Sequence, residues 1–191
     1  MLKYMEEYFG NPSSMYQLGL DSEKAVKHAR KQVEEAMGAG NGSLVFTSGG
    51  TEADNTAIFG AARALRRRGN KIITSAVEHP AVLECCRRLE QDGYDVVYIG
   101  VDGKCRLDLE QLEDAIDENT ILVSLMQVNN EAGTIMPVDA VKDLMKKKNA
   151  PGWFHCDAVQ SFGKLQVPES ADLISVSSHK IHGPKGAGAL F

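Results

Sequence analysis

The chain has 191 residues, which is enough for a large domain with a buried core. Its composition, 43% hydrophobic and 25% charged, is ordinary for a soluble globular protein. The net charge of −5 argues against a nucleic-acid-binding surface, and no apolar run approaches membrane-spanning length. The four cysteines show neither CxxC nor zinc-ligand spacing, so we expect no metal site and a reducing, cytoplasmic compartment.

The N-terminal part of the chain is predicted to be helical. A short helix is expected within residues 1–10, and a turn at 11–14, where Pro, Asn and Ser favour turns. From Asp21 to Met37 apolar residues recur at helical spacing, which predicts a second helix. The glycine-rich stretch 38–42 is expected to end it.

Short apolar strands alternate with amphipathic helices in the rest of the chain. Strands are predicted at 44–47, 71–75, 94–99, 120–126, 153–157 and 172–176, and a last strand begins at 188. Helices are predicted at 52–68, 80–91, 108–116 and 137–148. This alternation predicts an α/β fold, with a mostly parallel sheet flanked by helices.

Polar residues follow the carboxyl ends of five predicted strands. In open α/β sheets these ends share one edge, and ligands bind there. Each such residue alone is more often a helix cap or a solvated surface group, but their combination at one edge favours a binding site. The candidates are Gly50, Thr51, His79, Asn130, Asp157, Gln160, Ser177, His179 and Lys180.

These residue types suit pyridoxal 5′-phosphate (PLP). Lys180 follows a buried strand, where desolvation lowers the pKa of a lysine and frees its amine to attack an aldehyde. Asp157 could pair with the pyridinium nitrogen and keep the ring an electron sink. His79 could stack on the ring. Gln160 and Asn130 could hydrogen-bond the ring oxygen or a substrate carboxylate.

The phosphate of such a cofactor would lie at a glycine turn that opens a helix. Gly50 allows a close approach of the backbone, and the helix start offers unpaired N–H groups and a positive dipole end. Thr51, Ser177 and His179 add further polar groups. The turn lacks the P-loop lysine and the GxGxxG spacing, so a nucleotide-binding Rossmann domain is the less favoured interpretation.

The same stretches make the chain resemble cysteine desulfurases of the NifS/IscS type, in class V of the fold-type I aminotransferases. The matching segments follow the family's order along nearly the whole chain: 9–14, 47–55, 77–79, 128–133, 157–160 and 177–186. The resemblance implies the large PLP-binding domain of that fold type. It also implies that Lys180 binds the cofactor and shuttles protons, and that His79 stacks on the ring.

The resemblance further implies an activity. L-cysteine would be converted to L-alanine, with sulfur passed to an enzyme cysteine as a persulfide. It implies a homodimer, a sulfur-acceptor protein and a place in iron–sulfur cluster assembly. A related class-V enzyme, such as a selenocysteine lyase or an aminotransferase, would keep the same cofactor residues and is the first alternative.

The sequence also departs from the family. The first N-terminal strand and everything beyond the cofactor domain have no counterpart here. None of the four cysteines (Cys85, Cys86, Cys105 and Cys156) matches the family's nucleophilic cysteine. We therefore expect residues 1–191 to be a partial PLP-binding large domain that is inactive alone. The second alternative is accordingly a non-catalytic fragment that folds, and holds PLP or dimerises, without turnover.

Overall fold

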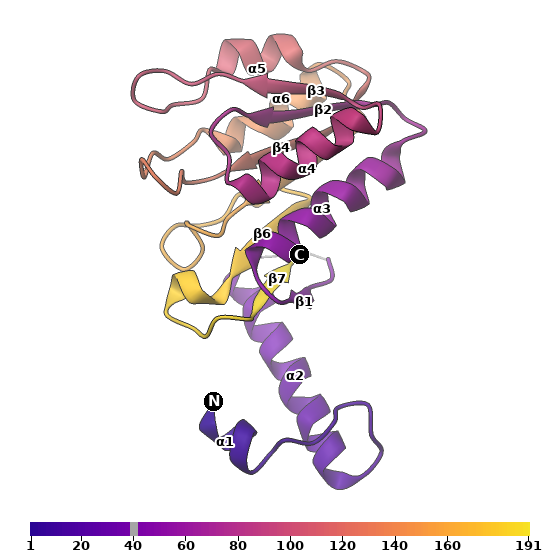
Figure 1. Ribbon diagram of the computed structural model, residues 1–191, viewed down its shortest axis with the longest axis vertical. Coiled ribbons are helices and arrows are strands. Elements are labelled where there is room, and N and C mark those ends of the chain that lie inside the picture. The colour runs from indigo at the N-terminus through magenta and orange to yellow at the C-terminus, as the bar shows by residue number, and fades with distance from the viewer. Residues whose placement is uncertain (39–41) are drawn as a thin grey trace. The chain divides into compact units, whose positions relative to one another are not determined.

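The computed structural model describes residues 1–38 and 42–191 (Figure 1). The chain forms two compact units, Met1–Ala39 and Gly40–Phe191. That residues 1–191 form part of one PLP-binding large domain stays a prediction. Among the described helices we find none whose length and apolar character would suffice for a membrane span.

The first unit contains helices α1 (Leu2–Glu6) and α2 (Gln17–Ala36). The predicted turn between them is confirmed, because the Asn11 side chain accepts a hydrogen bond from the backbone N–H of Ser13 at 2.9 Å. Helix α2 begins at Gln17 rather than Asp21, since Gln17 donates a side-chain hydrogen bond to Asp21 within the first turn. Gly38 follows the helix in the left-handed region, and residues 39–41 of the predicted stop lie outside the described residues.

The second unit is built on a seven-stranded sheet with the order β1-β7-β6-β5-β4-β2-β3. All neighbours from β3 to β6 pair in parallel, which confirms the predicted mostly parallel sheet. β7 runs antiparallel to both β6 and β1, so β1 points the same way as the parallel strands. The strands are β1 (Val45–Thr47), β2 (Lys71–Ser75), β3 (Asp95–Ile99), β4 (Thr120–Met126), β5 (Trp153–Asp157), β6 (Leu173–Ser177) and β7 (Gly188–Leu190).

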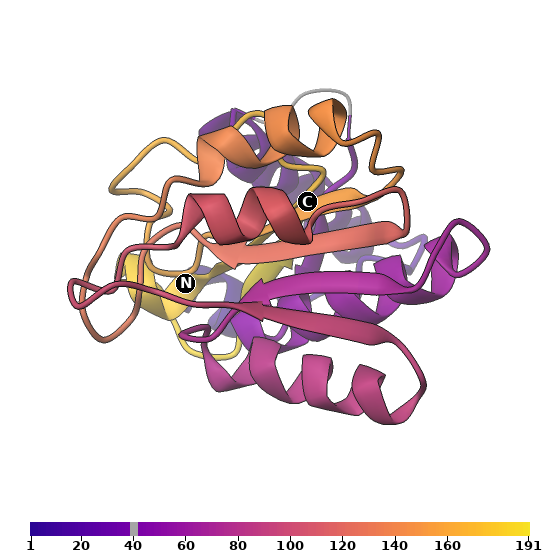
Figure 2. The same cartoon turned by 90° about the horizontal axis from the view of Figure 1, so that it is seen from above.

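Helices cover both faces of this sheet. They are α3 (Gly50–Leu65), α4 (Pro80–Gln91), α5 (Leu109–Ala115) and α6 (Val141–Lys147), with 3₁₀ turns η1 (Val138–Ala140) and η2 (Ser178–Ile181). Figure 2 shows α5 and α6 on one side of the sheet and α4 on the other. Helices α3 and α4 bury apolar residues such as Ile58 and Val82 against Ile72 of β2 and Leu122 of β4. This burial fixes α3 and α4 over the sheet.

Helix α3 and the segment after β6 differ from the prediction. Helix α3 begins at Gly50 rather than at residue 52, because the Glu52 carboxylate accepts a hydrogen bond from the Ser48 N–H and closes the preceding turn. It ends at Leu65 rather than at residue 68. The predicted loop after β6 instead begins with η2, and this 3₁₀ turn carries Lys180.

Candidate active site

A pocket of about 240 Å³ lies at the carboxyl edge of the sheet. Its lining comes from the ends of β1, β2, β4, β5 and β6, which converge because all five strands point the same way. Every one of the nine residues singled out from the sequence lines this pocket. They are Gly50, Thr51, His79, Asn130, Asp157, Gln160, Ser177, His179 and Lys180. Their individual roles stay predictions.

One side of the pocket continues into a polar depression at the N-terminus of α3. Both spaces are lined by Gly50, Thr51, Ser177 and His179. Lys185 lines the depression but not the pocket. The Ser177 hydroxyl lies 2.8 Å from Nδ1 of His179, which fixes the imidazole toward the strand end. Hydroxyls, an imidazole, an ammonium group and helix N–H groups in one place form a suitable environment for a phosphate.

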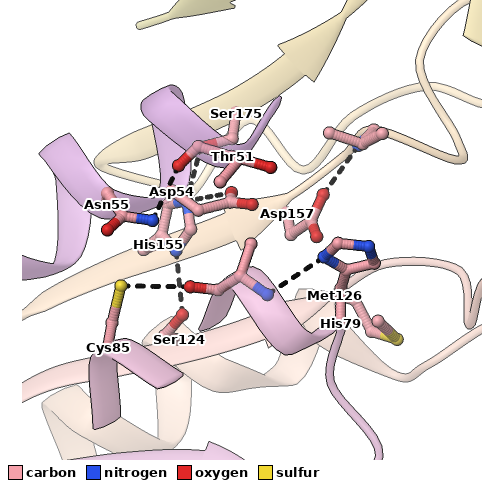
Figure 3. A network of polar contacts seen from close by, with 12 residues as sticks. Thr51, Asp54, Asn55, His79, Cys85, Ser124, Met126, His155, Asp157 and Ser175 are labelled. Carbon is pink, nitrogen blue, oxygen red and sulfur yellow. Dashed lines mark hydrogen bonds and ion pairs between the residues drawn. The ribbon is translucent and has the colours of Figure 1, made fainter. Parts of the chain in front are cut away.

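His79 is the N-cap residue of α4. Its Nδ1 accepts a hydrogen bond from the backbone N–H of Ala81 at 3.1 Å (Figure 3). Pro80 at the first helical position reinforces this start, as the sequence predicted. The contact leaves Nε2 free of the cap and fixes the plane of the ring, so the helix start orients a flat side chain at the pocket.

Asp157 ends β5 and is only 6% exposed. Burial raises the pKa of this carboxyl, while the Val159 N–H, which donates to Oδ1 at 2.9 Å, and His79 both act to lower it. Asp157 is therefore a buried acidic group whose ionised form has a backbone donor. A cation in the pocket would find its counter-ion here.

Asn129 shapes the wall that carries Asn130. Its Oδ1 accepts hydrogen bonds from the N–H groups of Glu131 and Ala132, at 3.0 and 2.8 Å, and its Nδ2 donates to the carbonyl of Val77 at 2.9 Å. The side chain thus turns the loop after β4 and ties it to the segment that precedes His79. The sequence analysis missed this role, although an Asn–Asn pair after a buried strand is typical of an Asx turn.

A buried polar network lies beneath the pocket, between α3 and the sheet (Figure 3). His155 of β5 is fully buried, with Nδ1 at 2.8 Å from the hydroxyl of Ser124 on β4 and Nε2 at 2.8 Å from that of Ser175 on β6. Asp54 of α3 is 2% exposed, and its Oδ1 lies 3.7 Å from Nε2 of His155. Burial lowers the pKa of His155 to about 3, so the imidazole is neutral.

The sequence analysis missed this network, although its members leave a trace in the sequence. Asp54 lies one helical turn from Ala57 and Ile58, both buried, so it shares the apolar face of α3. His155 precedes Asp157 by two residues on one strand, which places both side chains on the same face of the sheet. An acid on an apolar helix face and a histidine in a buried strand were the available indications.

The thiols lie elsewhere. None of the four cysteines lines the pocket, and three of them (Cys85, Cys86 and Cys156) are buried. Burial raises the pKa of Cys85 and Cys86 to about 12 and raises that of Cys156 well above its usual range. Reactive thiolates need a lowered pKa, so these three are structural residues.

Comparisons with known proteins agree with this geometry. The sequence model of the class-V aminotransferase family matches residues 1–191. The chain is 45% identical over its whole length to "Putative cysteine desulfurase IscS 1" of Bacillus subtilis, covering 51% of that protein. It is 46% identical over its whole length to "Cysteine desulfurase IscS" of Methanosarcina thermophila, covering 48%. The chain thus spans about half the length of the curated relatives it matches.

Solved structures show the same relationship. A protein described as "NIFS-LIKE PROTEIN" superposes with a TM-score of 0.95 at 39% identity, over 100% of this chain and 53% of the other. A structure titled "SspA in complex with cysteine" gives a TM-score of 0.91 at 36% identity, over 99% and 55%. Family match, sequence identity and fold all agree: the chain belongs to the class-V aminotransferase family.

Proposed function

We propose that this chain is the cofactor-binding part of a PLP-dependent cysteine desulfurase, which converts L-cysteine to L-alanine and passes the sulfur to an enzyme cysteine as a persulfide. The observation that carries the proposal is a pocket that is lined by an amine and a buried carboxyl group and adjoins a polar depression suited to a phosphate. The relatives at 45–46% identity bear the name cysteine desulfurase, which supports the substrate.

The residues present fit PLP. Lys180 supplies an amine for the aldehyde, and the depression around Thr51 and Ser177 supplies donors for the phosphate. Asp157 supplies a counter-ion for a protonated ring nitrogen, and the cap at α4 holds the ring of His79 at the pocket. Bound PLP would contribute an electron sink that stabilises negative charge on the substrate's carbon atoms.

The chain's own residues then have distinct tasks. Lys180 would hold or release a proton at its Nζ beside the substrate, and the carboxylate of Asp157 would keep the ring nitrogen protonated. Asn130 would orient the substrate carboxylate through its amide, and Gln160 would do the same for the ring oxygen. A homodimer and a sulfur-acceptor protein belong to the same proposal.

The position of the cysteines favours a second candidate function for the isolated chain. No cysteine lines the pocket, and burial keeps Cys85, Cys86 and Cys156 protonated. The pocket formed by the described residues therefore contains no thiolate that could take sulfur from a bound substrate. We propose that residues 1–191 alone bind PLP without completing sulfur transfer.

An absorption titration tests the cofactor site. PLP added to the purified chain is expected to give a visible band that Lys180→Ala abolishes and that shifts when L-cysteine is added. Borohydride reduction followed by peptide mass spectrometry should place the cofactor on Lys180. Lys146→Ala is the matched control, because Lys146 is an exposed lysine of α6 far from the pocket lining, and it should keep the band.

The outcomes separate the candidates. A chain without a Lys180-dependent band would overturn the PLP site. An absorption band that does not shift with L-cysteine but shifts with another amino acid would favour a different class-V enzyme. Alanine and persulfide produced from L-cysteine by a longer protein that contains this chain, but not by residues 1–191, would support both parts of the proposal.

A further inference from the structure

Asp54 is an acidic side chain that lacks a donor for one of its oxygens. It is 2% exposed and lines the pocket, yet its Oδ1 has no hydrogen-bond partner among the described residues. Nε2 of His155 lies 3.7 Å from this oxygen, beyond hydrogen-bond distance. The Ser175 hydroxyl acts on this carboxyl group as a hydrogen-bond partner. A buried carboxylate with an unpaired oxygen is strongly disfavoured, whereas a carboxylic acid in the same place is not.

Among the described residues, no buried cation faces Asp54. The groups that face it from neighbouring elements are His155 and Asp157 of β5, Glu78 before α4, and Cys85 of α4. His155 is neutral because burial depresses its pKa, and the Cys85 thiol is protonated. Burial, followed by the charges of Asp157 and Glu78, raises the pKa of Asp54 well above its usual range, against the Ser175 hydroxyl, which lowers it.

The negative charges of ionised Asp54 and ionised Asp157 would repel each other, and the environments of the two carboxyl groups differ. Asp157 has the Val159 N–H as a backbone donor and His79 nearby, and both favour its ionised form. Asp54 has one serine hydroxyl and an oxygen without a donor. Of two carboxyl groups that line one pocket, the group whose ionised form has fewer hydrogen-bond donors keeps its proton more readily. That group is Asp54.

We propose that Asp54 is a positioning residue of the cofactor site: a buried carboxylic acid that stays protonated at the pocket wall and so leaves the negative charge there to Asp157. The relevance to PLP rests on the proposed function, because only a protonated ring nitrogen needs that charge. The protonation state of Asp54 itself does not depend on any cofactor. The proposed protonation and the proposed PLP function can therefore fail separately.

The proton on Asp54 also sets the direction of the hydrogen bonds below the pocket. With Asp54 protonated, its O–H would donate to Ser175, the Ser175 hydroxyl would donate to Nε2 of His155, and Nδ1–H of His155 would donate to Ser124. If Asp54 were ionised, Ser175 would donate to it and every bond would reverse, leaving the proton of His155 on Nε2. The tautomer of His155 therefore reports the charge of Asp54.

The first experiment measures protonation in the purified 191-residue chain without cofactor. Infrared spectra at neutral pH are expected to show a protonated-carboxyl C=O band that Asp54→Asn removes and Asp157→Asn retains, with Glu78→Gln identifying the band of Glu78. Nitrogen-15 NMR of the unaltered protein should show His155 as the Nδ1–H tautomer. A band lost in Asp157→Asn, or an Nε2–H tautomer, would overturn the proposal. The NMR measurement needs no variant, so it decides even if Asp54→Asn does not fold.

The second experiment compares the affinity of PLP with that of an analogue whose ring nitrogen is replaced by carbon. Asn reproduces the neutral acid's donor to Ser175, so Asp54→Asn should keep the wild-type preference for PLP within about threefold. Asp157→Asn should reduce this preference about tenfold or more, because a charge-assisted contact is lost. Asp54→Leu should weaken PLP binding, since it removes the Asp54 contact of the Ser175 hydroxyl and leaves this hydroxyl only His155. Equal losses in Asp54→Asn and Asp157→Asn would show that Asp54 carries charge and contradict the proposal.

Discussion

Oε1 of Glu78 accepts a hydrogen bond from the backbone N–H of Met126 at 3.1 Å, across the ends of strands β2 and β4. The same oxygen accepts a hydrogen bond from the Ser75 hydroxyl at 2.6 Å, while Oε2 has no partner among the described residues. One buried carboxyl group thus joins two strand ends immediately before His79. Burial raises the pKa of Glu78 to about 8, although both of these donors act to lower it.

The first prediction is that Glu78 makes stability fall as pH rises. Its folded pKa of about 8 lies above the unfolded value of about 4.3. The folded state therefore binds the extra proton between these two values, and the free energy of unfolding falls by about 1.4 kcal/mol per pH unit there. Glu78→Gln removes this dependence. Urea unfolding from about pH 5.5 to 7.5 measures this effect. The unfolding free energy of the variant minus that of the wild type should rise by about 1.4 kcal/mol per pH unit.

Glu118→Gln is the control for this series, because Glu118 is an exposed residue. Its unfolding free energy should follow the wild type at every pH. A difference between Glu78→Gln and wild type that stays constant with pH would show that Glu78 is ionised in the folded protein, against the prediction.

The second prediction separates the two tasks of His79. Asn is a good N-cap without an aromatic ring, so His79→Asn should keep the stability of α4 and weaken PLP binding. Phe keeps a flat ring but cannot accept the Ala81 N–H, so His79→Phe should bind PLP more tightly than His79→Asn while losing about 1 kcal/mol of stability. Thermal unfolding and PLP titration measure the two effects. Parallel losses of both properties in both variants would count against stacking by this ring.

The third prediction concerns the contact between β7 and the glycine turn. A Cβ atom at Gly188 would lie 2.7 Å from Cα of Gly49, which lines the polar depression. Gly188→Ala should therefore displace the turn, destabilise the protein by about 1–3 kcal/mol and weaken PLP binding. Gly60 is the matched control, because nothing lies within 4 Å of its added Cβ in α3. Gly60→Ala should stabilise the protein by about 0.5–1 kcal/mol and leave PLP affinity unchanged. Unaltered PLP binding in Gly188→Ala would show that the turn adapts.

The fourth prediction concerns the cysteines. Cys105 is the one cysteine that is not buried, so it should react with iodoacetamide in the folded protein. Cys85, Cys86 and Cys156 should react only on unfolding, because burial keeps each of them protonated. Mass spectrometry of the native protein should show a single modification, which Cys105→Ser abolishes. Fast native labelling of Cys85 or Cys86 would reveal an opening of α4 that the structure does not show.

Much of the fold follows from local sequence pattern. The predicted bounds of β2, α4, β4 and β5 match the structure, because buried apolar runs and a proline at the first helical position define them locally. The starts of α2 and α3 were missed, since side-chain hydrogen bonds such as that from Ser48 to Glu52 extend these helices backwards. Such bonds depend on turn geometry that hydrophobic periodicity does not describe.

The site shows the same division. The residues that line the pocket could be named from the sequence because each one follows a strand, and parallel strands bring their ends together. The network around His155 could not, because its partners Ser124 and Ser175 are 31 and 20 residues away along the chain.

The sequence by itself determined the order of strands and helices and the residue types at the strand ends, since both depend on neighbours along the chain. Only the tertiary structure decided the order β1-β7-β6 within the sheet, which places Gly50 and Thr51 beside Ser177. It also decided which acids are buried together. Charge and protonation at Asp54, Glu78 and Asp157 depend on desolvation and on groups distant in sequence, and these exist only once the sheet and α3 have packed.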